Sequence, residues 1–173
     1  MYWYVLFVRT GKEHTVEKFL KERLDAEVFM PFVPLHERLF KMHGIIKKEI
    51  KPLFPGYVFI ESEMSNQEFI RSTSKLINTS TNIVRIMRYT DTEIAIRESE
   101  RLMLLSLFND QHCIEASSGI IEGDKIIITE GPLKGFEGVI IKVNRHKRQA
   151  WMKMNFLGEH RLVCCALTIV DRL

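Results

Sequence analysis

A segment in the last third of the chain carries the residue types that bind polyanions. Between Gly138 and Gly158 the sequence has no acidic residue. The basic residues of this segment are Lys142, Arg145, Lys147, Arg148 and Lys153. Cations gathered without acids are the usual electrostatic footprint of a nucleic-acid partner. On charge alone, an ordinary solvated strand-and-turn face explains the segment equally well.

The distribution of charge along the chain points to the same region. The 173 residues include 25 Lys+Arg and 22 Asp+Glu, for a formal net charge of +3. Residues 1–118 hold 16 basic and 16 acidic residues, whereas residues 119–173 hold 9 basic and 6 acidic ones. The whole positive excess therefore belongs to the part of the chain that contains the basic segment.

Alternation along residues 149–156 predicts which way Trp151 points. One face of this strand would bury four apolar side chains, those of Ala150, Met152, Met154 and Phe156. The opposite face would bury Lys153, at a cost of several kcal/mol, against a return of about 2–3 kcal/mol from one large apolar side chain. Trp151 is therefore expected on the outer face, where its ring can stack on an RNA base. The alternative is a tryptophan covered by the linker or by another domain.

Polar residues around the basic turn complete a candidate RNA surface. Asn144 and Gln149 flank the turn, and their amides can both donate to and accept from base edges. Lys134 and Phe136 extend the surface. The full candidate RNA-binding set is Lys134, Phe136, Lys142, Asn144, Arg145, His146, Lys147, Arg148, Gln149, Trp151 and Lys153.

Motifs for catalysis, metal binding and membrane insertion are absent from the sequence. The six histidines lack metal-ligand spacing, and neither G-x-S-x-G nor a P-loop occurs. Cys113, Cys164 and Cys165 form no C-x-x-C pair, which argues against a disulfide scaffold and structural zinc. An acylphosphatase-like enzyme would need a glycine-rich loop after Thr10, and that loop is missing. We expect no enzyme, no cofactor, no metal and no membrane partner; without a signal-peptide pattern at Met1, a cytoplasmic protein is expected.

The first 108 residues alternate between strand and helix patterns. Capping-box patterns at Thr10-x-x-Glu13, Ser65-x-x-Glu68 and Thr90-x-x-Glu93 predict three helices, the last running to Phe108. Strands are predicted over residues 2–10, 28–37, 57–61 and 83–87, with a hairpin over 39–51 that turns at 42–44. The expected fold is α+β, an antiparallel sheet with helices on one face, close to a ferredoxin-like plan.

The pattern changes after residue 108. Residues 109–118 are small and polar without periodicity, which is typical of a linker. Short strands follow at residues 125–129, 139–144, 149–156 and 160–167, with a last piece at 168–170. So many short strands in so short a segment favour a small closed β-barrel over residues 119–173.

Four motifs, in this order and spacing, resemble the NusG family of transcription elongation factors. They are Trp3-Tyr4-Val5, Phe54-Pro55-Gly56-Tyr57-Val58, Gly123-Asp124 and Gly131-Pro132-x-x-Gly135-x-x-Gly138. The resemblance implies a NusG N-terminal (NGN) domain over 1–108, a linker over 109–118 and an SH3-like KOW barrel over 119–173. The runs 52–55 and 123–131 and the basic segment look like specialised paralogs, of the LoaP type first and RfaH second.

The resemblance also implies where RNA polymerase docks. Phe7, Tyr57 and Phe59 match the positions where the family contacts the coiled-coil clamp helices of the polymerase. Core packing of strand aromatics is the alternative for these three. Arg71, Ser72 and Thr73 match a second polymerase contact, for which an ordinary exposed helix surface is the alternative.

Together these features imply a processive antiterminator that acts as a monomer. Its N-terminal domain would hold the polymerase clamp, and its KOW domain would hold a nascent RNA hairpin in an operon leader. The loop 156–158 matches the family's contact with a small-subunit ribosomal protein or Rho, although Glu159 departs from the usual basic residue. The alternatives are a housekeeping factor that couples polymerase to the ribosome or Rho, and a KOW RNA-binding protein that never contacts polymerase.

Overall fold

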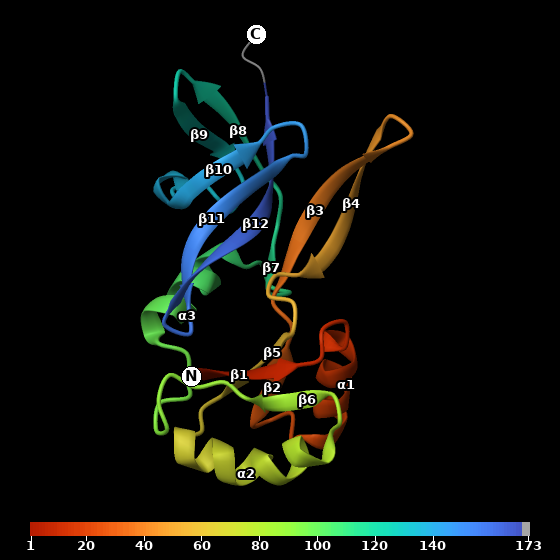
Figure 1. Ribbon diagram of the computed structural model, residues 1–173, viewed down its shortest axis with the longest axis vertical. Helices are drawn as coiled ribbons and strands as arrows, with labels where there is room; N and C mark the ends of the chain where they lie inside the picture. Colours follow the sequence, from red (N-terminus) through yellow and green to blue (C-terminus); the bar gives the residue numbers. More distant parts are fainter. Residues whose placement is uncertain (171–173) are drawn as a thin grey trace. The chain divides into compact units, whose positions relative to one another are not determined.

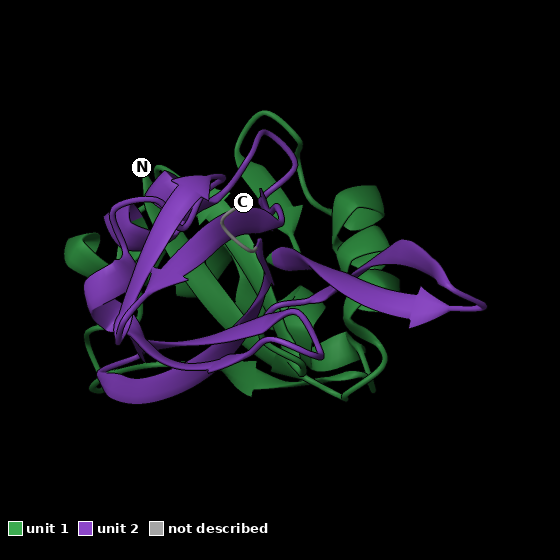
Figure 2. Cartoon of the chain, turned by 90° about the horizontal axis from the view of Figure 1, so that it is seen from above, with its two compact units in different colours: residues 1–34, 54–101 green, residues 35–53, 102–173 purple. Residues whose placement is uncertain are grey.

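The structure, a computed structural model, describes residues 1–170 and separates into two compact units (Figure 2). Unit 1 consists of residues 1–34 and 54–101, and unit 2 consists of residues 35–53 and 102–173. The last three residues of the predicted KOW domain lie outside the described residues. The two units are described one at a time.

Unit 1 is a four-stranded antiparallel sheet with two helices. Its strands are β1 (Tyr2–Val8), β2 (Phe29–Phe32), β5 (Tyr57–Ser62) and β6 (Ile83–Ile86), in the spatial order β2-β5-β1-β6. Helix α1 (Glu13–Arg23) connects β1 to β2, and α2 (Asn66–Thr79) connects β5 to β6 (Figure 1). This order is that of the split β-α-β arrangement of ferredoxin-like folds, which confirms the predicted fold class.

The two faces of β1 carry different aromatic clusters. On one face the Tyr4 ring stacks on Phe69 of α2, with 3.8 Å between ring centroids. On the other face Trp3 meets Phe32 and Phe59 edge-on at 5.1 and 5.9 Å. Because strand side chains alternate, both faces of β1 are buried, which accounts for its nearly continuous apolar sequence. Such aromatic pairs add about 0.5–1.5 kcal/mol each beyond the area that they bury.

Only one of the three predicted capping boxes starts a helix. At Ser65 the hydroxyl accepts from the Glu68 N–H and the Glu68 carboxylate accepts from the Ser65 N–H, so α2 begins as predicted. The prediction for Thr10 is wrong, because Lys12 occupies the N-cap of α1 without a side-chain cap. The Glu13 carboxylate instead accepts from the N–H groups of Gly11 at 3.1 Å and Gly56 at 2.8 Å.

The third box fails because tertiary packing holds the residues that follow it in an irregular path of turns and bends. The Thr90 hydroxyl accepts from the Glu93 N–H at 3.1 Å, yet α3 spans only Glu98–Leu107. Between them Ile94 and Ile96 are buried, and the Ile96 N–H donates to the Trp3 carbonyl at 2.8 Å. Burial of two isoleucines and a bond to the edge of β1 therefore outweigh the local helix signal.

Unit 2 contains the predicted sheet of short strands, which forms a half-barrel and not the fully closed barrel that the sequence favoured. Its five strands lie in the order β10-β11-β12-β8-β9. Their bounds are β8 (Ser117–Glu122), β9 (Lys125–Glu130), β10 (Ile140–Asn144), β11 (Gln149–Phe156) and β12 (Glu159–Ile169), with a 3-10 turn η1 (Glu137–Val139) before β10. The pieces predicted at 160–167 and 168–170 form a single strand, β12, whose end pairs in parallel with β8.

The predicted inward face of β11 is confirmed. Ala150, Met152, Met154 and Phe156 are all buried, with at most 3% of any of them exposed. Gln149 and Trp151 are half-buried and Lys153 is exposed on the opposite face.

A second sheet of unit 2 brings together segments that are far apart in the sequence. The hairpin of β3 (Leu35–Met42) and β4 (Ile45–Pro52) pairs through β3 with the short strand β7 (Cys113–Ile114). Strand β7 lies within residues 109–118, where the sequence predicted a linker, and β8 already begins at Ser117. The compact units therefore have different bounds from the predicted domains 1–108 and 119–173.

Glu37 fastens this hairpin to the rest of unit 2. Its side chain is buried, and its carboxylate accepts from the Ala116 N–H at 2.7 Å and from the Lys48 ammonium at 2.9 Å. Burial alone raises the pKa of Glu37, but the bonds from Lys48 and Ala116 outweigh burial and hold the pKa below its usual value. Glu37 is therefore ionised at neutral pH and joins β3, β4 and the segment after β7.

Replacing Glu13 by glutamine tests the tie between the start of α1 and the turn at Gly56. Burial raises the pKa of Glu13, but three backbone N–H groups, those of Glu13, Gly56 and Gly11, lower it further than burial raises it. Because the folded pKa is depressed, the ionised form stabilises the fold above the unfolded pKa, and this contribution is lost as the pH falls through the folded pKa. We expect Glu13→Gln to lower the free energy of unfolding by about 1–2 kcal/mol at pH 7.

Urea unfolding at pH 7 and at about pH 3 measures this difference. The difference between wild type and Glu13→Gln should shrink at the lower pH, while the exposed control Glu22→Gln on the same helix changes stability by less than about 0.5 kcal/mol at either pH. An equal loss for Glu13→Gln at both pH values would contradict a role for its charge.

Replacing Glu37 by glutamine tests the attachment of the hairpin. The weakened bonds to Lys48 and Ala116 should cost about 1.5 kcal/mol. We expect amide hydrogen exchange to become about tenfold faster in residues 35–53 and 111–116, with smaller changes in β10–β12. Glu49→Gln is the matched control, since Glu49 on the same hairpin pairs with the exposed Arg38. Equal exchange in both variants would show that Glu37 does not hold the hairpin.

Candidate nucleic-acid interface

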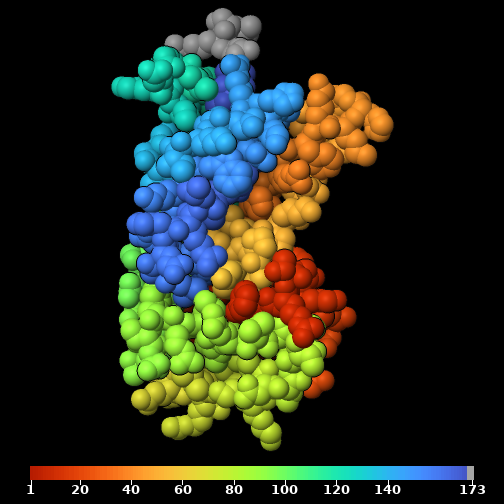
Figure 3. Space-filling model, viewed as in Figure 1, coloured from red at the N-terminus to blue at the C-terminus, as the bar shows by residue number. Residues whose placement is uncertain are grey.

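A groove with basic walls runs between β3 and the turn that joins β10 to β11. It encloses about 480 Å³ and is lined by residues 38–41 and 145–149. Arg38 and Lys41 come from β3, and Arg145, Lys147 and Arg148 come from the turn. In Figure 3 the hairpin, in orange, lies beside the blue strands of the same unit. Cations on two walls suit the phosphates of a nucleic acid.

A smaller recess adjoins the groove and contains Trp151. It encloses about 160 Å³ and shares Arg38, Leu39, Arg148 and Gln149 with the groove. Its remaining lining residues are His36, Glu37, Trp151, Cys164, Cys165 and Ala166. The interface thus combines a charged groove with a largely apolar recess at its side.

The backbone of the basic turn explains how its side chains are presented. The Asn144 side-chain oxygen accepts from the Lys147 N–H at 3.0 Å. Arg148 adopts a left-handed conformation with φ of 55°, and its carbonyl accepts from the Leu167 N–H at 3.0 Å. Arg145, His146 and Lys147 are exposed, whereas Arg148 and Gln149 are half-buried. Asn144, predicted to contact base edges, has a structural role in closing this turn.

Trp151 points out of the barrel, as the alternation predicted. It is half-buried and pairs with Lys142 on β10 and with Cys164 on β12. Trp151 lines the same recess as residues 36–39 of β3, which belong to the predicted N-terminal domain. Burial raises the pKa of the Cys164 thiol although the nearby Arg38 lowers it, so the thiol beside Trp151 is uncharged at neutral pH.

Four of the predicted RNA-binding residues lie elsewhere on unit 2. Lys142 and Lys153 are exposed on β10 and β11, Lys134 is exposed after β9, and Phe136 is half-buried before η1. Among the residues that the structure describes, these four line neither the groove nor the recess. Their contact with RNA stays a prediction.

The wall formed by β3 was missed by the sequence analysis. His36, Arg38, Leu39, Phe40 and Lys41 line the groove or the recess. The basic residues of the hairpin are visible in the sequence and could have suggested this wall. No local pattern, however, places the hairpin beside residues 145–148. Burial, together with neighbouring Arg38 and Lys51, lowers the pKa of His36 more than the Glu37 backbone and Glu49 raise it, so the ring is neutral at pH 7.

The three aromatic residues predicted to dock on polymerase differ in exposure. Phe7 and Tyr57 face each other across β1 and β5 with ring centroids 5.5 Å apart, and the Arg85 guanidinium lies 6.0 Å from the Phe7 ring. Phe7 is half-buried and Tyr57 is 8% exposed. Phe59 is fully buried and stacks with Phe54 at 6.1 Å, as the core-packing alternative described.

The second predicted polymerase contact lies on α2. Arg71 and Ser72 are exposed. Thr73 is buried, and its hydroxyl donates to the Phe69 carbonyl at 2.7 Å within the helix. Thr73 therefore supports α2, while its two neighbours remain accessible.

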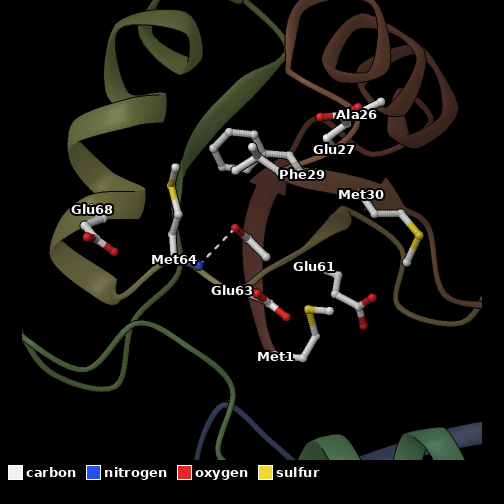
Figure 4. A pocket seen from close by; sticks show the side chains of 11 residues that line it. Met1, Ala26, Glu27, Phe29, Met30, Glu61, Glu63, Met64 and Glu68 are labelled. Atoms are coloured by element: carbon white, nitrogen blue, oxygen red, sulfur yellow. Dashed lines mark hydrogen bonds between the residues drawn. The ribbon is translucent and has the colours of Figure 1, made fainter.

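Unit 1 has a hollow of the opposite charge (Figure 4). It encloses about 550 Å³, and its lining includes Glu27, Glu61, Glu63 and Glu68. Carboxylates repel phosphates, so this hollow is unsuited to RNA. Within residues 1–170, no cluster of three or more histidine, cysteine, aspartate or glutamate side chains could hold a metal ion. In the same part of the chain, no helix has the length and apolar character needed to span a bilayer.

Comparisons with known proteins agree with this architecture. Curated proteins named transcription termination/antitermination protein NusG match at 22% identity in Thermus thermophilus, over 90% of each chain, and at 24% in Neisseria meningitidis, over 99% of this chain and 97% of the other. The Halalkalibacterium halodurans protein of that name matches at 22% over 99% of this chain and 98% of its own length.

A solved structure shows the same fold. The one described as "Domain interaction in Thermotoga maritima NusG" superimposes with a TM-score of 0.56 and 19% identity, over 96% of this chain and 93% of that chain. The KOW motif model matches residues 122–153, which contain the basic turn. The model described as transcription termination factor nusG matches residues 1–105, more than half of the chain, and the chain therefore belongs to the NusG family of transcription termination and antitermination factors.

Proposed function

We propose that this chain is a specialised NusG-family factor of the LoaP type, a processive antiterminator that binds RNA polymerase and a nascent RNA hairpin. The family consists of transcription factors that are not enzymes, and the proposed action is binding alone, in the cytoplasm. The observation that carries the proposal is the groove in which Arg38 and Lys41 face the basic turn beside an outward Trp151.

The chemistry of the groove favours RNA over a protein partner. Phosphates take charge-assisted hydrogen bonds from arginine and lysine, and Trp151 offers a ring on which a base can stack. Exposed Lys142 and Lys153 extend the cationic surface on the same side of the barrel as Trp151. An RNA hairpin in an operon leader would then recruit the factor to selected transcripts.

The polymerase contact is proposed for unit 1. The half-buried Phe7 with Tyr57 and the adjacent Arg85 form a small aromatic surface with a cation at its rim, which suits a helical partner. Phe59 supports this surface from the core, and Arg71 and Ser72 on α2 are proposed for the second contact. Holding the clamp closed would oppose the opening that pausing and termination require.

The loop 156–158 is the proposed site for a further partner. Leu157 has a left-handed backbone with φ of 54°, and the Arg161 guanidinium lies 4.9 Å from the Phe156 ring. A small-subunit ribosomal protein is the candidate partner at this loop, and the exposed Glu159 beside it would weaken contacts with acidic surfaces.

Charge and ring substitutions should affect RNA binding in different ways. We expect Arg145→Ala and Lys147→Ala to weaken binding and to flatten the dependence of log affinity on log salt by about 0.7–0.9 for each phosphate that the variant no longer neutralises. Trp151→Ala should weaken binding about 5- to 150-fold, since base stacking is worth about 1–3 kcal/mol, with little change in the salt slope.

Fluorescence anisotropy of a pool of RNA hairpins with randomised loops, titrated at several KCl concentrations, measures both quantities. Lys75→Ala on α2 is the matched control, an exposed lysine of unit 1 that should leave affinity and slope unchanged. Unaltered low-salt affinity in all the unit 2 variants would refute an RNA site at this turn.

Truncating Phe7 tests the polymerase contact separately. Phe7→Ala should reduce recovery of core RNA polymerase by the full-length chain at least about tenfold, because aromatic anchors dominate interface energies. Phe7→Leu keeps most of the buried volume and checks that the fold survives. RNA affinity should stay at the wild-type value in both variants. Undiminished recovery of polymerase by a folded Phe7→Ala protein would place the contact elsewhere.

A further inference from the structure

We propose that the recess between β3 and Trp151 receives a single unpaired pyrimidine of the bound RNA, while the cations of the adjoining groove hold the phosphates on either side of it. This inference rests on the proposed function and specifies its ligand. The RNA would be a hairpin whose loop or bulge turns one base outward, and β3 would form the second wall of the site.

The size of the recess fits one six-membered ring. Its volume is about 160 Å³, close to the roughly 150 Å³ of an apolar protein cavity that binds benzene. A uracil or cytosine has one ring of this size, whereas a purine has two fused rings. The recess therefore favours pyrimidines by volume.

The lining matches the two faces and the edge of a base. Trp151 supplies an aromatic face for stacking, and Leu39 and Ala166 supply apolar contacts. The Gln149 amide and the neutral His36 ring can hydrogen-bond a base edge. A purely apolar ligand in the recess would offer the Gln149 amide and the His36 ring no hydrogen-bond partner.

No uncompensated negative charge lies in the recess to repel the RNA. The Glu37 carboxylate is already bonded to Lys48 and to the Ala116 N–H. The Cys164 thiol is uncharged at neutral pH, because burial raises its pKa. The charged groups that face the recess are thus the paired Glu37 and the two arginines Arg38 and Arg148.

The recess and the groove are continuous, so one nucleotide can use both. Arg38 and Arg148 line both hollows, and Lys41, Arg145 and Lys147 line the groove alone. Arg38 also pairs with Glu49 at 3.0 Å, an exposed ion pair that costs little to exchange for a phosphate. A base in the recess would leave its sugar-phosphate at the junction, between cations of β3 and of the turn.

Such a site would also explain selectivity for particular transcripts. Paired RNA shows proteins mostly shape and backbone, and sequence-specific recognition relies on unstacked bases. Basic residues on an open surface would bind all hairpins alike. A recess for one ring converts that attraction into a preference for hairpins with a pyrimidine at one position.

Three hairpins with one stem test the proposal with the full-length protein. Their loops are all uridine, all adenosine, or a hexaethylene glycol linker without bases. We expect the wild-type protein to bind the uridine loop about tenfold more tightly than the linker loop, with the adenosine loop between them. A 5-bromouridine in the uridine loop should crosslink under ultraviolet light to the peptide that contains Trp151.

Cys164→Phe fills the recess from β12 and should abolish the preference among the three loops. Leu162→Phe is the matched control, since Leu162 is exposed two residues away on β12 and should keep the preference. Arg38→Gln should weaken binding to all three hairpins, whereas Lys47→Gln on β4, which lines neither hollow, should not.

Wild-type binding to all three hairpins with equal affinity, unchanged in Cys164→Phe, would overturn the base recess and leave the proposed RNA-binding function standing. Failure of the wild-type protein to bind any of the hairpins at low salt would overturn both the base recess and the proposed RNA-binding function. A preference for the adenosine loop that survives Cys164→Phe would likewise overturn the recess.

Discussion

The buried carboxylate of Glu37 is the interaction on which the candidate site depends. It lies on β3, is 7% exposed, and bonds both Lys48 on β4 and the backbone before β8. A buried charge needs partners of this kind, because an unpaired carboxylate would cost several kcal/mol. By meeting that need, Glu37 fixes the hairpin where Arg38 and Lys41 face the basic turn. Without this wall, the turn would be an open basic surface.

The side chains of β11 alternate between its two faces, and the two faces have different roles. Its inward residues from Ala150 to Phe156 build the core of the sheet, and its outward residues Gln149, Trp151 and Lys153 remain for a ligand. A one-residue shift of register would exchange these faces and bury Lys153. The core therefore holds the outward residues in place, which explains how so small a sheet positions a large aromatic side chain at its surface.

Features set by neighbours in sequence were predictable, and features set by distant partners were not. The direction of Trp151 followed from the cost of burying Lys153, and the start of α2 followed from Ser65 and Glu68. The boxes at Thr10 and Thr90 failed because Gly56 and Trp3, far away in sequence, supply competing bonds. The β3 wall was missed for the same reason: its charges are visible in the sequence, but its place beside the turn depends on Glu37 and β7.

The hollows of the two units carry opposite charges, so they suit different partners. Unit 1 has a hollow with four glutamates in its lining, and these carboxylates repel phosphates. Its aromatic pair beside Arg85 is the surface proposed for a protein partner. In unit 2, five cations from β3 and the basic turn line one groove, whereas others lie elsewhere on the unit. Under the proposed function, the transcript is the partner of unit 2 and the polymerase is the partner of unit 1. Because phosphates are the same in every transcript, the proposed preference for one transcript requires contacts with bases, and the recess at Trp151 is the proposed place for them.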